Sequence, residues 1–353
     1  MSKGSGRKGV VTAHPAAGSV VVGYGPISFV MRRRPAVVGA VLALLTGAAA
    51  VVSVGVGTSF VPPADVVRAL AGRGSFIVVV QDLRLPRITV GLAVGALLGL
   101  SGALLQSISR NPLASPDVVG ITSGAGLTAT IAMSAGLGTL WLGPAALLGG
   151  LVAAAVVFAL SWRHGLAAHR FVLCGMAVAL ALRALTEVVI VDADPIEGQR
   201  ARIWLAGSLN GLGYPEARTL LIPLLLLGPV LLWAGRALDT TALDDDTARG
   251  LGVRVVPRRV ALGAVAVVLA ALSTSQAGAV DFVALAAPQL ARRLIRAERP
   301  PLASAALTGA LLTVVADLIA RTAFAPIQLP VGVLTAALGG PYLLWLLVRR
   351  EKA

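Results

Sequence analysis

Charged side chains are scarce in the apolar parts of this sequence, and the few that occur there could do chemistry. Arg183 and Glu187 stand four residues apart inside one apolar run, and Asp317 and Arg321 have the same spacing near the end of another. Because residues i and i+4 share one face of a helix, each pair can neutralise itself. Ionisable groups inside a membrane indicate function by default, here a proton relay. A structural ion pair near an aqueous end is an equal alternative.

Other residue types argue against enzymatic chemistry in this chain. The serines of the apolar runs have no histidine on a plausible partner segment, and Cys174 is a lone cysteine suited to a small core position. The histidines do not form a ligand set, so we expect no metal site and no catalytic residues. A P-loop requires a lysine that reaches the phosphates, yet every lysine lies in a terminal segment: Lys3, Lys8 and Lys352. Transport would therefore need either coupling to an ion gradient or a separate ATPase subunit. In the second case, the ATPase subunit would bind the ATP and Mg²⁺, and this chain would need no cofactor.

The composition is that of an integral membrane protein. Hydrophobic residues make up 57% of the chain and charged residues 13%, with a mean hydropathy of +0.86. A soluble domain carries about 25% charged residues. The net charge of +14 comes from short arginine clusters between apolar runs, which the positive-inside rule explains better than nucleic-acid binding does. Aromatic residues are only 4%, too few for base-stacking platforms.

The apolar runs predict an all-α membrane domain of about ten transmembrane helices spanning residues 35–350. Each run approaches the length of about 20 residues that a helix needs to cross a bilayer. Residues 1–34 predict a flexible, basic cytosolic tail, and ten spans return the C-terminus to the cytoplasm. The predicted spans are residues 36–57, 88–107, 118–139, 140–161, 171–191, 217–235, 259–279, 282–295, 302–320 and 329–348.

Small residues form a stripe in the second predicted span. Gly91, Gly95 and Gly99 make two successive GxxxG steps. Such stripes let helix backbones approach closely in lipid. Packing between helices of the same chain is the favoured interpretation, and a subunit interface is the alternative.

The stretch RNPLASPDVVG at residues 110–120 lies between two apolar segments of membrane-spanning length. Pro112 and Pro116 prevent the helix from continuing. Irregular backbone is tolerated at membrane depth only where protein buries it or water lines it. A turn that caps a helix and a turn that gates a pathway both satisfy this condition.

The largest loop predicted on the cytosolic side spans about residues 237–258. Asp244, Asp245 and Asp246 can cap a short helix and match the charge of its N-terminus. Gly252 can end that helix in a left-handed conformation. A short helix lying across the cytosolic face is what a soluble ATPase subunit would grip, whereas an ordinary amphiphilic loop is the plain alternative.

At this point a resemblance becomes specific. The chain resembles FecCD-type ABC permeases, the family that carries vitamin B12, haem and ferric siderophores. The motifs that carry the resemblance occur in family order at residues 82–87 (DLRLPR), 101–106 (SGALLQ), 110–126 (RNPLASPDVVGITSGAG), 204–211 (WLAGSLNG), 248–253 (ARGLGV), 281–294 (DFVALAAPQLARRL), 316–321 (ADLIAR) and 329–347 (LPVGVLTAALGGPYLLWLL). Three residues differ from those of many relatives: Asp281, Gln289 and Gln328.

The resemblance implies a type II ABC importer permease in a bacterial plasma membrane. Its partners would be a second permease subunit, expected to be a paralogue that forms a heterodimer, two ATPase subunits and an extracytoplasmic siderophore-binding lipoprotein. The DFVALAAPQ form resembles the second permease of paired ferric-siderophore importers. Permeases for vitamin B12 or haem, and an ion-coupled secondary transporter, are the alternatives.

The resemblance also implies roles for individual residues. They are a cytosolic gate (Asn111, Pro112, Leu113, Arg163 and Arg170), contacts that couple to the ATPase (Asp246, Ala248, Leu251 and Gly252), and docking of the binding protein at the outer face (Arg84, Arg87 and Arg321). Arginine suits docking because its planar fork binds a carboxylate at two points.

Overall fold

A computed structural model describes residues 19–24, 27–57, 59–161, 168–241, 245–324 and 327–350. Apart from one hairpin near the N-terminus, the described elements are helices, as the apolar runs predict. They are α1 (Arg33–Gly55), α2 (Pro63–Leu70), the π-helical segment η1 (Val78–Arg84), α3 (Leu85–Ser109), α4 (Ile121–Ser134), α5 (Thr139–Ser161), α6 (Ala168–Asp192), α7 (Pro195–Leu205), α8 (Tyr214–Leu226), α9 (Gly228–Thr241), α10 (Asp245–Gly250), α11 (Val255–Ala277), α12 (Val283–Ile295), α13 (Leu302–Thr322) and α14 (Val331–Arg350).

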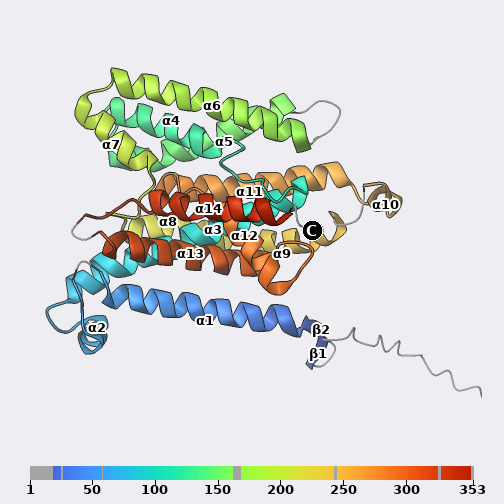
Figure 1. Ribbon diagram of the computed structural model, residues 1–353, viewed down its shortest axis with the longest axis horizontal. Coiled ribbons are helices and arrows are strands. Elements are labelled where there is room, and N and C mark those ends of the chain that lie inside the picture. The colour runs from blue at the N-terminus through green and yellow to red at the C-terminus, as the bar shows by residue number, and fades with distance from the viewer. Residues whose placement is uncertain are drawn as a thin grey trace, which may run out of the picture.

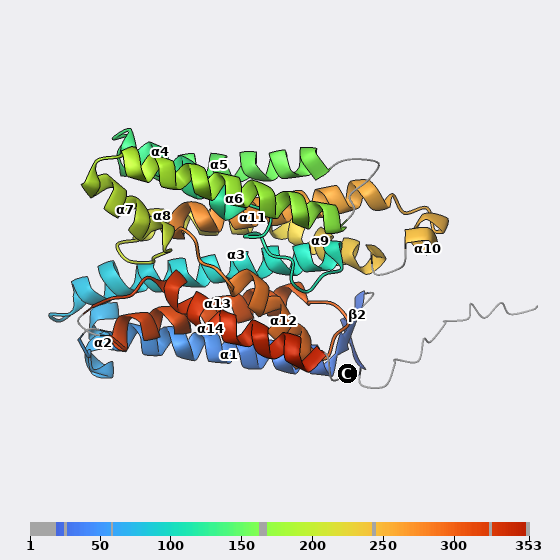
Figure 2. The same cartoon turned by 45° about the horizontal axis from the view of Figure 1, so that its top comes forward.

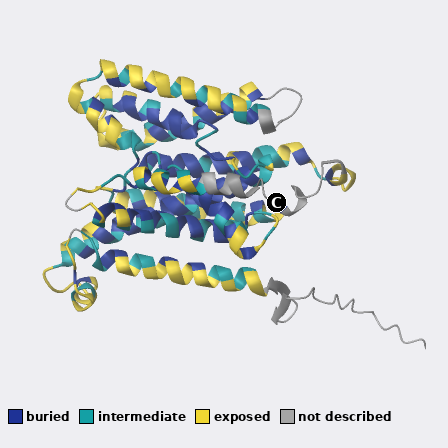
Figure 3. Cartoon of the chain, in the orientation of Figure 1, coloured by how far each residue is buried: buried dark blue, intermediate teal, exposed yellow. Residues whose placement is uncertain are grey.

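The long helices run side by side, and short elements cover the two ends of the bundle (Figures 1 and 2). The elements α2 and α7 lie at one end, while α10 and the N-terminal hairpin lie at the other. Exposed residues concentrate on α1 and α6, and the helices between them are mainly buried (Figure 3). The exposed side chains of these two helices include large apolar ones, such as Leu44 and Leu180. Such surfaces suit lipid or another subunit.

The ten predicted spans all fall on helices, but they are not equally able to cross a bilayer. Within the described residues, six helices are long and apolar enough, or seven if α8 and α9, which are bent by 51° at their junction, form one span. The helices α4 and α12 have 14 and 13 residues, which at a rise of about 1.5 Å per residue reach about 20 Å. Because a hydrocarbon core is about 30 Å thick, neither can cross it alone, and the count of ten is approximate.

The centre of the bundle is α3, which packs on α13, α11, α12 and α8. A Cβ atom added at Gly95 or Gly99 would overlap the backbone of Gly309 or Ala305 on α13. These glycines therefore allow two backbones of the same chain to touch. The structure confirms the interpretation of this stripe as intrachain packing.

The N-terminal segment differs from the expected flexible tail. Strands β1 (Ser19–Tyr24) and β2 (Ile27–Arg32) pair in an antiparallel hairpin that leads directly into α1. Val, Ile, Phe and Tyr in this segment suit strands, but the segment is too short to stand out beside the glycine-rich residues that precede it.

Candidate functional site: gate turn, coupling helix and outer arginine cavity

The turn after α3 is irregular but supplies most of its own hydrogen bonds. Arg110 ends α3 in a left-handed conformation with φ of 49°. The Asn111 side chain then accepts a hydrogen bond from the backbone N–H of Leu113 at 3.0 Å, and the Asn111 carbonyl accepts one from Ala114 at 3.2 Å. Asn111 thus shapes the turn, which leaves Leu113 partly exposed at the surface. Both features are compatible with a capping turn and with a gate.

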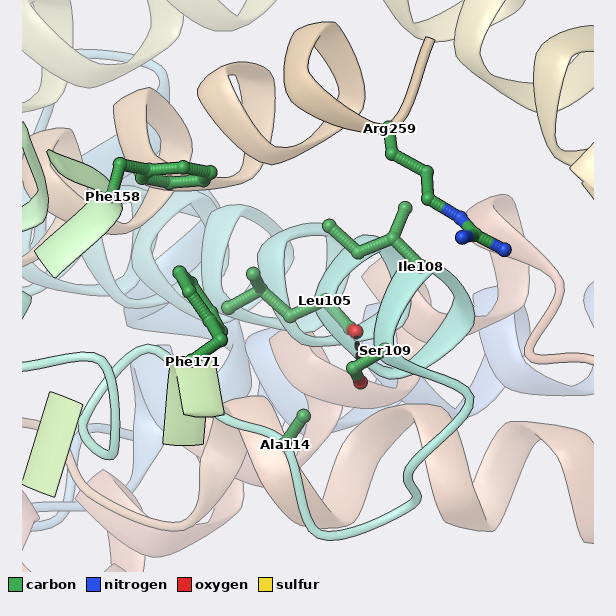
Figure 4. A pocket seen from close by; sticks show the side chains of 7 residues that line it. All are labelled: Leu105, Ile108, Ser109, Ala114, Phe158, Phe171 and Arg259. Carbon is green, nitrogen blue, oxygen red and sulfur yellow. Dashed lines mark hydrogen bonds between the residues drawn. The ribbon is translucent and has the colours of Figure 1, made fainter. Parts of the chain in front are cut away.

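A small apolar cavity of about 40 Å³ borders this turn (Figure 4). The rings of Phe158 from α5 and Phe171 from α6 lie 5.1 Å apart between their centroids on one side of it. Ala114 brings the turn itself to the lining, and the remaining lining residues are Leu105, Ile108, Ser109 and Arg259. The turn therefore has unfilled space on the side of α5 and α6.

The second predicted part of the gate consists of Arg163 and Arg170. Arg163 lies outside the described residues, and Arg170 is half-buried in the first turn of α6. The gate assignment of these two arginines stays a prediction.

The predicted short helix in the cytosolic loop is present as α10, at one end of the bundle (Figure 1). Gly252, with φ of 77°, ends it, and the N–H of Val253 donates back to the Ala248 carbonyl at 3.0 Å. Ala248 is 1% exposed and packs within its own chain, whereas Leu251 is 68% exposed. The side chain of Asp246 lies outside the described residues. Of the predicted coupling residues, Leu251 is the apolar one that another subunit could touch.

The three predicted docking arginines lie around one cavity of about 380 Å³, at the end of the bundle opposite α10. Their side chains are not displayed on the surface as we expected: Arg84, Arg87 and Arg321 are 6%, 8% and 4% exposed. Arg84 donates to the carbonyls of Val54 at 2.7 Å and Gly55 at 2.9 Å. This contact ties η1 to the end of α1.

Arg87 and Arg321 share one carboxylate. The ion pairs to Asp317 are 2.7 Å from Arg87 and 3.1 Å from Arg321. Arg87 also donates to Asn210 at 3.3 Å and to Gln328 at 3.0 Å. The predicted pairing of Asp317 with Arg321 is confirmed. Asp317 also has a second partner, Arg87 of α3, which lies 230 positions away in the sequence. The group carries more positive than negative charge around the cavity.

The other predicted pair, Arg183 with Glu187, is wrong. Arg183 donates to the Ser123 hydroxyl of α4 at 3.3 Å, and Glu187 pairs with Arg202 of α7 at 3.3 Å. The i,i+4 spacing permits a pair along α6, but partners on neighbouring helices compete for both side chains.

Arg183 instead lies within electrostatic reach of two carboxylates, Asp117 and Asp281. Burial and, to a lesser extent, the nearby Asp281 raise the pKa of the Asp117 carboxyl to about 7, although the hydrogen bond from Thr122 at 2.7 Å acts in the opposite direction. Asp117 and Asp281 both lie within the motifs that resemble the FecCD family, but no role was predicted for either of them. Their proximity depends on loops far apart in the chain, so spacing alone could not reveal it.

No group of three or more His, Cys, Asp or Glu side chains that could hold a metal ion occurs in the described part of the chain. What the geometry offers is an irregular turn, a protruding short helix and an arginine-lined cavity, distributed over the two ends of a membrane bundle. This arrangement fits a permease.

Comparison with known proteins agrees with this conclusion. Residues 42–349 match the model of the FecCD transport family. The achromobactin transport system permease protein CbrC of Dickeya dadantii is 42% identical over 87% of this chain and 90% of its own length. The ferric enterobactin transport system permease protein FepG of Escherichia coli is 41% identical over 79% and 84%.

A solved structure gives the same fold. An inward-facing ABC transporter, described as of the metal-chelate type, superposes with a TM-score of 0.77 at 28% identity, covering 89% of this chain and 99% of its own. The chain therefore belongs to the FecCD transport family, a family of ABC transporter permease subunits.

Proposed function

We propose that this chain is the membrane-spanning subunit of an ABC importer that carries a ferric siderophore into the cytoplasm. The observation that carries the proposal is the similarity over most of its length to permeases named for achromobactin and ferric enterobactin. A second candidate cargo is vitamin B12, because a cobalamin import system permease protein of Halobacterium salinarum is 38% identical over 78% of this chain.

ATP hydrolysis takes place on two separate subunits that grip α10. The absence of a P-loop lysine from the sequence supports this division of labour, as does the exposed Leu251 beside α10. A paralogous permease forms the other half of the pathway against the exposed apolar face of α6. In this arrangement α10 and both chain termini face the cytoplasm, and α2 and α7 face outward.

A substrate-binding lipoprotein docks over the outer cavity and inserts acidic side chains toward Arg84, Arg87 and Arg321. The excess positive charge around the cavity supports this role, although the arginines act from below the surface. Because charge attraction across an interface mainly sets association rates and is screened by salt, docking to the purified complex should slow as salt rises. An association rate that does not change with salt would remove the cavity from the interface.

The proposed function is tested by deleting the gene in its own host and measuring uptake of radiolabelled iron chelates, vitamin B12 and haem. We expect selective loss of uptake of one ferric siderophore. Loss of vitamin B12 or haem uptake alone would contradict the siderophore assignment. Purification of the chain should also yield an ATPase subunit, and transport by the chain alone with an ion gradient would overturn the ABC assignment.

A further inference from the structure

Two buried glutamines connect the gate turn to the core of the bundle. Gln106 of α3 is 4% exposed and Gln289 of α12 is 1% exposed. The Gln289 amide donates to the Gln106 side-chain oxygen at 2.5 Å and to the Pro112 carbonyl at 3.3 Å. The Gln106 amide donates in turn to the Leu285 carbonyl of α12 at 3.1 Å. We call these two side chains the glutamine clasp.

The orientation of the clasp is fixed from α12. Arg292 stands three residues after Gln289, on the same face of that helix, and donates to the Gln289 side-chain oxygen at 3.1 Å. The oxygen is therefore engaged within α12, and the NH₂ group points to Gln106 and Pro112. Buried amides are costly unless they are hydrogen-bonded, so the pair holds its geometry as a unit.

Pro112 is where the clasp reaches the turn, and the two sides of the turn differ. On the α12 side, the Pro112 carbonyl receives the hydrogen bond from Gln289. On the side of α5 and α6, the buried Ala114 borders the small apolar cavity. The turn is thus held to α12 by a polar contact at Pro112. A small cavity beside Phe158 and Phe171 borders it at Ala114 (Figure 4).

We propose that Gln289 is a positioning residue for the cytosolic gate, where the Gln106–Gln289 clasp holds the Pro112 part of the turn to α12. This inference rests on the proposed function, since it assigns the turn to a gate. The clasp keeps Leu113 in place at the surface; without it, the turn swings toward the cavity beside Phe158 and Phe171.

The test measures the turn directly. A single cysteine at Leu113, in a chain whose own Cys174 is replaced by serine, is labelled with a maleimide in the complex as it purifies, with and without ATP. Replacing Gln289 by leucine removes the donor to Pro112. A net hydrogen bond contributes about 1 kcal/mol. We therefore expect the labelling rate without ATP to fall about fivefold, because Leu113 leaves the surface. Any change caused by ATP should shrink.

Two further variants separate positioning from folding. The double variant Q106L/Q289L removes both members of the Gln106–Gln289 hydrogen bond, so that neither buried amide is left facing an apolar replacement of the other. Size-exclusion chromatography checks that it folds, and the folded variant should retain the altered labelling. The variant Q276L, at a half-buried glutamine near the far end of α11, should label like the parent.

Unchanged labelling at Leu113 in the folded double variant would overturn the clasp. The result is independent of the cargo, because labelling requires no transport. If the host-deletion assay excludes siderophore import while labelling still responds to Gln289, the proposed cargo fails and the clasp stands.

Discussion

Replacing Leu251 with aspartate will abolish ATP-driven uptake while the permease still reaches the membrane in normal amount. Leu251 is 68% exposed just after α10, so its side chain contributes little to the fold of its own chain. Contact with an ATPase would remove it from water, and a carboxylate there would lose hydration without a partner. Truncating a central interface residue costs about 2 kcal/mol or more, which is about thirtyfold in affinity. Co-purification of the ATPase and iron uptake are the measurements.

Two controls define what a loss of coupling means. Ala248→Glu places a charge at a position that is 1% exposed, so it should disturb the fold of the loop and lower the level of the permease as well as uptake. Leu70→Asp introduces the same charge at a half-exposed leucine of α2, at the opposite end of the bundle. It should leave ATPase co-purification unchanged. Wild-type co-purification and uptake in Leu251→Asp would show that α10 is not the coupling element.

The contrast between Ala248 and Leu251 shows where sequence reasoning stops. Charge and glycine placement correctly predicted a short helix in this loop, because Gly252 ends it with positive φ. A helix of six residues is too short for its periodicity to tell the buried face from the exposed one. Which residue meets a partner therefore depended on how α10 sits on α9 and α11.

Hydropathy correctly predicted the long helices. A run such as α1 is apolar over most of its length, and in lipid its backbone groups must form their hydrogen bonds within the segment. The same signal cannot show that α4 begins only at Ile121, after an irregular turn, or that α12 begins at Val283 after a left-handed Phe282. Those boundaries are set by contacts with other helices, which one sequence does not reveal.

The ion pairs illustrate the limit most clearly. Spacing along α13 predicted that Asp317 meets Arg321, and it does. The same spacing along α6 predicted a pair of Arg183 with Glu187 that does not form, because Arg183 and Glu187 find partners on α4 and α7. Local geometry permits a contact, but the competing partners come from the tertiary fold.

Replacing Asp317 with alanine will destabilise the permease more than replacing either arginine that it binds. The side chains of Arg87 and Arg321 are 10% and 5% exposed, and Asp317 is the acidic partner of both. Its removal leaves two buried guanidinium groups without a counter-charge, and breaking a buried ion pair costs about 3–5 kcal/mol. Arg87→Met should cost less, because Asp317 keeps Arg321. Thermal unfolding of the detergent-purified protein, followed by size-exclusion chromatography, measures the difference.

The triple variant R87M/D317L/R321M provides the decisive comparison. Replacing a whole buried ion cluster by apolar side chains of similar volume is often neutral or stabilising, so this variant should unfold near the temperature of the parent, well above D317A. The double reversal R84E/R87E should instead unfold early, since it removes the Arg84 contacts to α1 and sets a new carboxylate beside Asp317. Its effect on docking would then report misfolding, so docking is read from the triple variant, which lacks two of the cavity's three arginines yet keeps the bundle. If D317A and the triple variant unfold at the same temperature, the cost lies in lost packing at this site and not in unpaired charge.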